Sequence, residues 1–339
     1  ANRRKGPNMR TMPFDIGPEG TELSLRLVTR QPLLQASLST PEYQVPLRQT
    51  NTPVYWIVPV NTGDSATPSL PSDEFLLRSQ LDTRAAFPVA DIEFVQRPPV
   101  LANPEGAEDA IALMNQYDQQ AVLAWTLGLL FTGESPFTLP DQIIGAFSEE
   151  KNLDGFAGMS DPRWWFGGAA RVVWIKEIPP EGGLLLPHEL NHNFDTNIQG
   201  SWGRHVAGCG STGLDPHWPY NDISIQQDAL VTEQVMGRNE LLLNPPVRVK
   251  PDVPDYMSYC RKQYGSRDTA RESYPCQWAS PYRWLRQIDR VFSPDAAPLT
   301  VARTANAATA SGSIGKMLYI TGRVNSDGSA DLDPVLRQP

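Results

Sequence analysis

Two kinds of apolar pattern occur between residues 51 and 180, continuous runs and helical spacing. Continuous apolar runs, such as Val54–Val60, are typical of strands buried on both faces of a sheet. Segments with apolar residues three and four positions apart predict helices, and one of them follows a cap-like Ser72-Asp73 pair. We expect strands at 54–60, 92–95, 143–147 and 170–175, and helices at 72–81 and 107–130. This order of strands and helices predicts an α/β fold.

The two ends of the chain have a shorter, β-type pattern. Residues 21–28 alternate apolar and polar side chains, as a strand does. Near the C-terminus, the segments 317–324 and 330–336 flank the turn-forming sequence Asn325–Gly328, which predicts a hairpin. We therefore expect three parts: an N-terminal β segment (1–50), a central domain (51–295) and a C-terminal β segment (296–339).

The composition of the 339 residues narrows the class of protein. A formal net charge of −9 argues against a nucleic-acid partner, because phosphate binding needs clustered Lys and Arg. No apolar run approaches the roughly 20 residues of a membrane span, and we expect the longest run, Ala121–Phe131, to be buried core. The 32 Pro and nine Trp, with few Lys, favour an extracellular protein rich in loops, and we expect a monomer. The first residues lack the apolar region of a signal peptide, so we expect a mature or trimmed chain.

Three cysteines allow one disulfide and leave one cysteine over. Cys260 and Cys276 bracket a polar segment that a disulfide would close, whereas Cys209 and Cys260 form the competing pair. The sequence does not choose between the two pairings.

The segment that carries chemistry is His188-Glu189-Leu190-Asn191-His192. On a helix, His188 and His192 share one face, four residues apart, and can bind one zinc ion (Zn²⁺) between their imidazoles. Leu190 falls on the opposite face, as does Phe194 further on, so that this face would be buried. Glu189 would be a general base that takes a proton from the attacking water. The spacing and the amphipathic surroundings together predict a catalytic metal site.

A catalytic zinc site needs a third protein ligand, for which the sequence offers several candidates. We prefer His205. Asp195 is the main rival, because a helix that continues past His192 would bring it to the same face. His217 and Glu233 are weaker alternatives, and the spacing does not decide among the four.

The stretch from His188 to Trp278 resembles the metzincin clan of zinc peptidases, and in particular the metzincin-like domains of large bacterial surface or secreted proteins. The resemblance rests on the His-Glu-x-x-His motif and on four later segments in the family's order. These are Gly203-Arg-His-Val-Ala-Gly-Cys-Gly210, Asp215-Pro-His-Trp-Pro-Tyr220, Met257-Ser-Tyr-Cys260 and Pro275-Cys-Gln-Trp278. Asn191 and Asp195 depart from the pattern, since both replace a glycine of the family.

The resemblance implies an α/β (α+β) metzincin-like catalytic domain, with an active-site helix and a Met-turn, flanked by small β (Ig-like) segments. It implies that Met257 forms an apolar floor beneath the zinc ion. It also implies that Tyr259 either binds the ion at rest or hydrogen-bonds the oxyanion of the tetrahedral intermediate.

From these features we expect a secreted or surface zinc metalloendopeptidase that hydrolyses protein or glycoprotein substrates. The aromatic run 162–167, with Trp202, Trp218 and Tyr220, is a candidate lining of the substrate cleft, whereas core packing is an equal alternative for Trp164 and Trp165. One alternative is a non-catalytic adhesin that keeps the fold, which the changes at Asn191 and Asp195 would favour. Another is a zinc amidase with a non-peptide substrate, since the same chemistry would serve it.

Overall fold

The computed structural model describes residues 50–64, 66–89, 91–160, 171–178, 184–197, 204–211, 213–226, 251–260 and 277–293, together with short strands elsewhere. For those short strands, and for residues 195–197, it describes the backbone alone.

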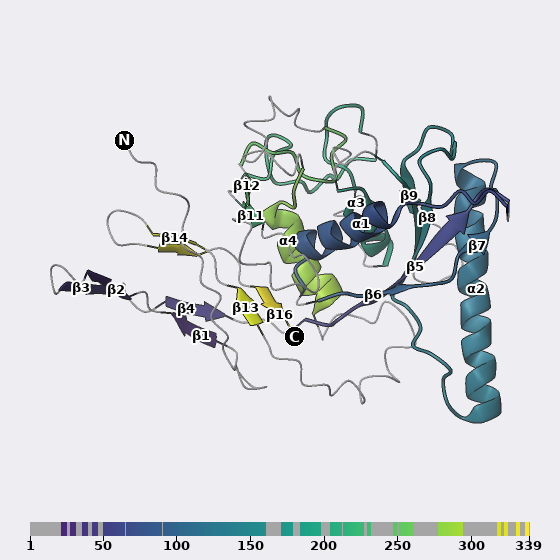
Figure 1. Ribbon diagram of the computed structural model, residues 1–339. Coiled ribbons are helices and arrows are strands. Elements are labelled where there is room, and N and C mark those ends of the chain that lie inside the picture. The colour runs from purple at the N-terminus through teal and green to yellow at the C-terminus, as the bar shows by residue number, and fades with distance from the viewer. Residues whose placement is uncertain are drawn as a thin grey trace.

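The helices that the structure describes are arranged around a six-stranded mixed sheet, with helices on both of its faces (Figure 1). The strand order is β6-β5-β8-β10-β9, and β7 pairs with a further part of β5. All pairs are parallel except β10–β9, so that β9 is an antiparallel edge strand. The strands are β5 (Val54–Asn61), β6 (Glu93–Gln96), β7 (Val100–Leu101), β8 (Gln142–Phe147), β9 (Gly158–Ser160) and β10 (Val172–Lys176). The fold is therefore of the α/β class, as the sequence pattern predicts.

Helices cover both faces of this sheet and create two apolar cores. The helix α2 lies along one face, while α1 and α3 lie on the other (Figure 1). Alternate residues of β5 serve the two cores, with Ile57 in the core beside α1 and α3 and Val58 in the core beside α2. The helices are α1 (Asp73–Ala86), α2 (Ala107–Thr132), α3 (Leu185–Asn197) and α4 (Pro281–Gln287), which continues into a π-helical turn (Ile288–Phe292). The core beside α1 holds α3 against the sheet through Leu186, Leu190 and Phe194.

Local sequence signals explain where several helices begin. The Ser72 hydroxyl accepts a hydrogen bond from the backbone N–H of Phe75 and caps α1, as the sequence predicts. Ser280 caps α4 in the same way, with Pro281 at the first helical position. Caps of this kind each contribute about 1 kcal/mol to helix stability.

The end of α2 corrects one expectation. We expected the apolar run Ala121–Phe131 to be buried core, but Leu130 is 72% exposed and Phe131 is 82% exposed. The reason is length. The 26 residues of α2 span about 39 Å, whereas the six residues of β8 span about 20 Å. The second half of α2 therefore extends past the strands that bury its first half.

Short antiparallel strand pairs lie in both end segments, in agreement with the β pattern of the sequence. The expected C-terminal hairpin is present as the pair β14–β15, although the expected strand 317–324 is divided between β13 and β14. The pairs in the end segments are β1 (Glu22–Leu25) with β4 (Tyr43–Pro46), β2 (Val28–Gln31) with β3 (Ala36–Ser39), β13 (Met317–Tyr319) with β16 (Leu336–Gln338), and β14 (Gly322–Val324) with β15 (Ala330–Leu332). A further pair, β11 (Ala229–Val231) with β12 (Val247–Val249), belongs to the central part of the chain.

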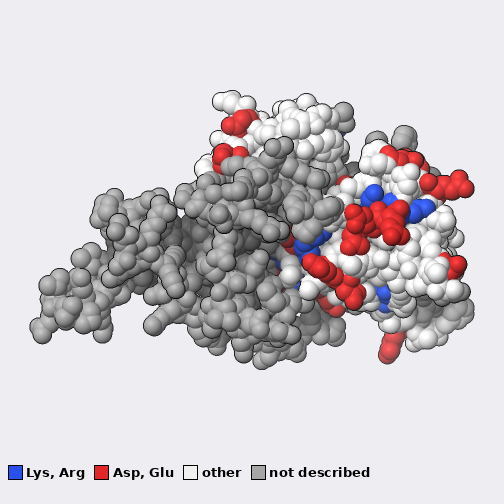
Figure 2. All heavy atoms as spheres, turned by 45° about the horizontal axis from the view of Figure 1, so that its top comes forward, with Lys and Arg blue, Asp and Glu red and all other residues white. Residues whose placement is uncertain are grey.

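Charges of both signs are distributed over the described part of the face in Figure 2, where acidic side chains predominate. Among the helices that the structure describes, none combines the length and the apolarity of a membrane span.

Candidate metal centre

The helix α3 presents two histidines on its partly buried face. His188 and His192 are one turn apart, and their ring centroids are 5.0 Å apart. On the other side of α3, Leu190 and Phe194 are fully buried in the core next to the sheet. The predicted amphipathic helix is therefore confirmed, with its apolar face fixed by the core and its histidines directed away from that core.

His205 joins the two histidines from a separate loop. Its ring centroid lies 5.1 Å from that of His188 and 4.7 Å from that of His192. The loop holds it by backbone hydrogen bonds, because the N–H of His205 donates to the carbonyl of Gly213 (3.2 Å) and its own carbonyl accepts from the N–H of Asp215 (2.8 Å). One nitrogen of each of the three histidines lies within 4.8 Å of the other two. The structure thus brings together the three histidines that the sequence analysis preferred.

The ring nitrogens of this cluster fit a metal ion. Nδ1 of His188 is 2.8 Å from the backbone carbonyl oxygen of Tyr256, which only accepts hydrogen bonds. Nδ1 therefore carries the proton, and Nε2 presents its lone pair to the cluster. The Nε2 atoms of His188 and His205 are 3.2 Å apart. Two nitrogens that bind one tetrahedral zinc ion are separated by about 3.3 Å. The three histidines could therefore hold a metal ion.

Glu189 lies in the same cleft as His188 and His192, but it is not a member of the three-histidine group. Its carboxyl group is buried, and this burial raises its pKa to about 8. The backbone N–H of Ser160, on β9, donates to the carboxylate and lowers the pKa in part. A carboxyl group with a pKa near neutrality is suited to accept and return a proton.

The cleft has a volume of about 440 Å³, within the usual range for ligand sites. The edge strand β9 and the preceding loop form one wall, and the first turns of α3 form another. Gly158 on β9 is in very close contact with Glu189, since a Cβ atom at this glycine would lie 2.8 Å from both Cγ and Oε1 of the glutamate. No sequence signal predicts this contact, because it joins residues 31 positions apart, one on a strand and one on a helix.

The turn that contains Met257 and Tyr259 closes the cleft. Met257 is fully buried in the same core as Leu190 and Phe194 of α3. Tyr259 is 47% exposed and lines the cleft, with its ring centroid 4.6 Å from that of His205. Partial burial raises the pKa of the Tyr259 hydroxyl, and the nearby Glu189 carboxylate raises it further. A protonated phenol therefore faces the histidine cluster at neutral pH.

A disulfide joins the histidine loop to this turn. Cys209 is bonded to Cys260, with Cα atoms 5.1 Å apart, and this selects one of the two pairings that the sequence left open. Gly208 and Gly210 take positive φ values on either side of Cys209, which also has a positive φ. The bond closes a sequence separation of 51 residues, and chain entropy predicts a stabilisation of about 4 kcal/mol for a loop of this size.

Other candidate residues lie apart from the cluster or outside the described residues. His217 is exposed on its loop, and its backbone N–H donates to Asp215. Trp218 packs edge-to-face on Tyr220 and on Tyr282, and the described lining of the cleft does not include Trp218 or Tyr220. Several candidates lie outside the described residues, as do their contacts: the side chain of Asp195, the residues Trp202, Glu233 and Cys276, and the whole aromatic run 162–167.

Sequence analysis missed the polar residues that support the cluster. Asp255 and Arg283 form an ion pair, and both side chains are 0% exposed. The hydroxyl of Tyr256 donates to Asn191 on α3, and Gln287 on α4 donates to both of these residues. One available signal was the Ser-Pro start of α4, which predicts a helix there; nothing in the spacing links that helix to the histidines.

The chain was compared with known protein families and with curated protein sequences, and neither comparison found a match. The site is therefore interpreted from its own geometry.

Proposed function

We propose that this chain is a zinc-dependent endopeptidase of the metzincin type that acts on protein or glycoprotein substrates outside the cell. The observation that carries the proposal is the convergence of three imidazole nitrogens beside a buried glutamate in one cleft. Three histidine ligands with an open fourth position are typical of catalytic zinc rather than structural zinc.

The donor set favours zinc over hard cations. Imidazole nitrogens suit Zn²⁺ and its neighbours in the transition series, whereas Mg²⁺ and Ca²⁺ prefer oxygen ligands. A zinc ion at this site would lower the pKa of water and polarise a carbonyl group. The residues of the chain would do the rest: His188, His192 and His205 bind, and Glu189 moves the proton.

Glu189 is placed for proton transfer. Its carboxylate lines the cleft next to the histidines and is held by the Ser160 N–H. In the proposed reaction the carboxylate accepts a proton from the attacking water, and the resulting carboxylic acid gives that proton to the leaving amine. One residue thus acts first as base and then as acid.

The edge strand β9 supports a peptide as substrate rather than a small amide. β9 is paired with β10 along one edge, and its residues 158–160 line the cleft along with the loop before it. An extended peptide can add to such an edge through main-chain hydrogen bonds. That mode of binding would place a backbone amide of the substrate near Glu189.

Asn191 bears on the adhesin alternative, which the change from glycine would favour. The side chain of Asn191 is fully buried, and it accepts hydrogen bonds from Tyr256 and Gln287. A residue built into the support of the histidines is consistent with a functional site, so this change no longer favours loss of function. The Cys209–Cys260 disulfide supports an extracellular location, because disulfides persist in oxidising compartments.

The direct test is metal content together with proteolysis. Purified protein would be analysed for bound metal by mass spectrometry and then incubated with a panel of unfolded proteins and glycoproteins, with and without a chelator. The proposal expects one zinc ion per chain and cleavage that the chelator abolishes and zinc restores. A chain without zinc, after exposure to excess zinc, would refute it. Zinc without any cleavage would favour the adhesin or the amidase, and a screen of non-peptide amides would separate those two.

Substitution of Tyr259 by Phe is expected to lower kcat by about 10- to 100-fold, because a donor to the oxyanion is lost while the ring remains. KM and metal content should stay within about threefold of the parent protein. Steady-state kinetics on a cleaved peptide would measure both. Tyr117→Phe, on α2 and away from the cleft, is the matched control. Unchanged kcat in Tyr259→Phe would remove this residue from the proposed chemistry.

Substitution of Gly158 by Ala is expected to lower kcat by about 100-fold while zinc binding is retained. The added methyl group would meet the Glu189 carboxyl group at 2.8 Å, and a displacement of about 1 Å can cost this much. Activity and metal content of the same preparation provide the measurement. The control is Gly155→Ala in the same cleft, because nothing lies within 4 Å of its added methyl group, although its positive φ makes that substitution strained. Full activity in Gly158→Ala would contradict the close packing of Glu189 on β9.

A further inference from the structure

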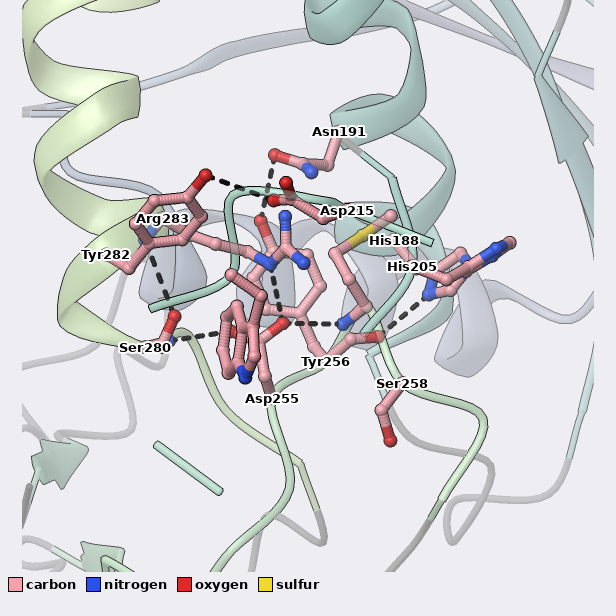
Figure 3. A network of polar contacts seen from close by, with 12 residues as sticks. His188, Asn191, His205, Asp215, Asp255, Tyr256, Ser258, Ser280, Tyr282 and Arg283 are labelled. Atoms are coloured by element: carbon pink, nitrogen blue, oxygen red, sulfur yellow. Dashed lines mark hydrogen bonds and ion pairs between the residues drawn. The ribbon is translucent and has the colours of Figure 1, made fainter. Parts of the chain in front are cut away.

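A buried ion pair lies behind the histidine cluster. Nε of Arg283 is 2.6 Å from Oδ1 of Asp255, and both side chains are 0% exposed (Figure 3). Burial of two charges costs free energy that their attraction only partly returns, so an apolar pair of similar volume would often be as stable. Stability alone therefore does not explain the presence of this ion pair, and the contacts that it makes with neighbouring segments indicate its role.

One side of the pair holds the loop of His205. Nη2 of Arg283 donates a hydrogen bond of 2.9 Å to the backbone carbonyl of Arg204, the residue before His205. The residue after it, Val206, donates its N–H to the carbonyl of Met257 (3.1 Å). His205 is thus fixed from both sides, on one side by the ion pair and on the other by the Met257 turn.

The other side of the pair shapes the Met257 turn. Oδ1 of Asp255 accepts the N–H of Met257 (2.9 Å), and Oδ2 accepts the N–H of Ser280 (3.1 Å). Between Asp255 and Met257, the carbonyl of Tyr256 accepts a hydrogen bond from Nδ1 of His188 at 2.8 Å. The conformation that Asp255 imposes therefore determines the direction of the carbonyl group that orients the His188 ring.

Side-chain hydrogen bonds also join α3, α4 and the Met257 turn to one another. The Tyr256 hydroxyl donates to Oδ1 of Asn191, on α3 between the two histidines (3.2 Å). Gln287, one turn after Arg283 on α4, donates to Oδ1 of Asn191 (3.0 Å) and to the Tyr256 hydroxyl (2.8 Å). The helix α4 thus contacts the supports of His188 and His205 at once (Figure 3).

We propose that Asp255 and Arg283 are positioning residues that hold His188 and His205 in a common frame and so set the affinity and geometry of the metal centre. His188 is on α3 and His205 is on a loop, and the ion pair joins a support of each. The proposal rests on the metal centre proposed above, but it does not depend on the substrate. Removal of such outer partners of ligating histidines lowers metal affinity by about 10- to 100-fold.

Arg283→Lys tests this inference. Lysine keeps a positive charge beside Asp255, but a single ammonium group cannot reproduce the planar fork that reaches Asp255 and the Arg204 carbonyl together. The dissociation constant for Zn²⁺ would be measured by competition with a chromogenic chelator, and the visible absorption of the Co²⁺ form would report ligand geometry. We expect the dissociation constant to rise at least tenfold and the Co²⁺ spectrum to change.

The matched control is Arg171→Lys at the ion pair with Asp118, which joins the residue before β10 to α2 on the other face of the sheet. It should lower thermal stability without a change in metal affinity or in the Co²⁺ spectrum. Arg283→Lys with a Zn²⁺ affinity within threefold of the parent, and with an unchanged spectrum, would overturn the proposal.

If Arg283→Lys does not fold, the double variant Asp255→Asn with Arg283→Met decides by the same criteria. It removes both buried charges, keeps an acceptor for the Met257 N–H and lacks the donor to Arg204. A parent protein that binds no Zn²⁺ would refute the metal centre itself, which is a different result from weak binding in the variants alone.

Discussion

Glu189→Gln is expected to lower the rate of peptide cleavage by about three orders of magnitude while one zinc ion per chain is retained. Glutamine fills the same space between α3 and β9 but cannot accept a proton, and general base catalysis contributes about 10²- to 10⁴-fold. Metal analysis and single-turnover cleavage of the same samples provide the measurement. Glu150→Gln, at an exposed position, is the control for the chemical change.

Glu189→Gln also tests how the stability of the metal-free protein depends on pH. Because the pKa of Glu189 is raised to about 8 in the folded chain, the folded state binds more protons than the unfolded state between the ordinary pKa of 4.5 and 8. The contribution of this residue to stability is therefore complete below pH 4.5 and is lost as the pH rises to 8.

Denaturant titrations of the metal-free parent and of Glu189→Gln should reveal this difference. The stability of the parent relative to Glu189→Gln should decline from pH 5 to pH 8. If the stabilities of the two proteins change with pH in parallel, Glu189 is not buried as the structure has it.

For the cleavage experiment, a rate in Glu189→Gln equal to that of the parent would show that Glu189 is not the general base.

His205→Ala is expected to weaken metal binding by about 10²- to 10³-fold and to abolish cleavage. Two imidazoles remain on α3, and a catalytic zinc site needs three protein ligands. If the three histidines contribute equally to a zinc-binding free energy of roughly 10 kcal/mol, the loss of one histidine lowers the affinity for zinc by about 10²- to 10³-fold. Dialysis followed by metal analysis would therefore leave the variant with well under one zinc per chain.

Two variants serve as matched controls for His205→Ala. His217→Ala removes an exposed histidine from the same loop region and should bind zinc like the parent protein. Asp195→Ala tests the rival ligand of the sequence analysis. Full zinc content in His205→Ala, together with loss of zinc in Asp195→Ala, would exchange the two assignments and overturn the site as described.

The sequence determined the elements whose signals are local. The apolar run Val54–Val60 and the helical pattern of 107–130 became β5 and α2, because a short continuous apolar run and a period-3.6 pattern indicate a strand and a helix without knowledge of their partners. The i, i+4 spacing of His188 and His192 likewise required nothing but a helix. The mainly apolar run Ala121–Phe131 did not reveal that α2 is longer than the sheet that it covers.

Tertiary structure decided everything that joins distant segments. His205 was one of several candidates because a loop has no period, and its place depends on the backbone bonds of that loop to Gly213 and, through Val206, to Met257. The pairing of Cys209 with Cys260 depends on distance in space, which spacing along the chain does not encode. Two further contacts join elements that are distant in the sequence and meet only in the packed fold. These are the contact of Gly158 with Glu189 and the ion pair of Arg283 with Asp255. The sequence by itself thus determined the two histidines and the glutamate of one helix, whereas packing across the fold decided which residues complete and support them.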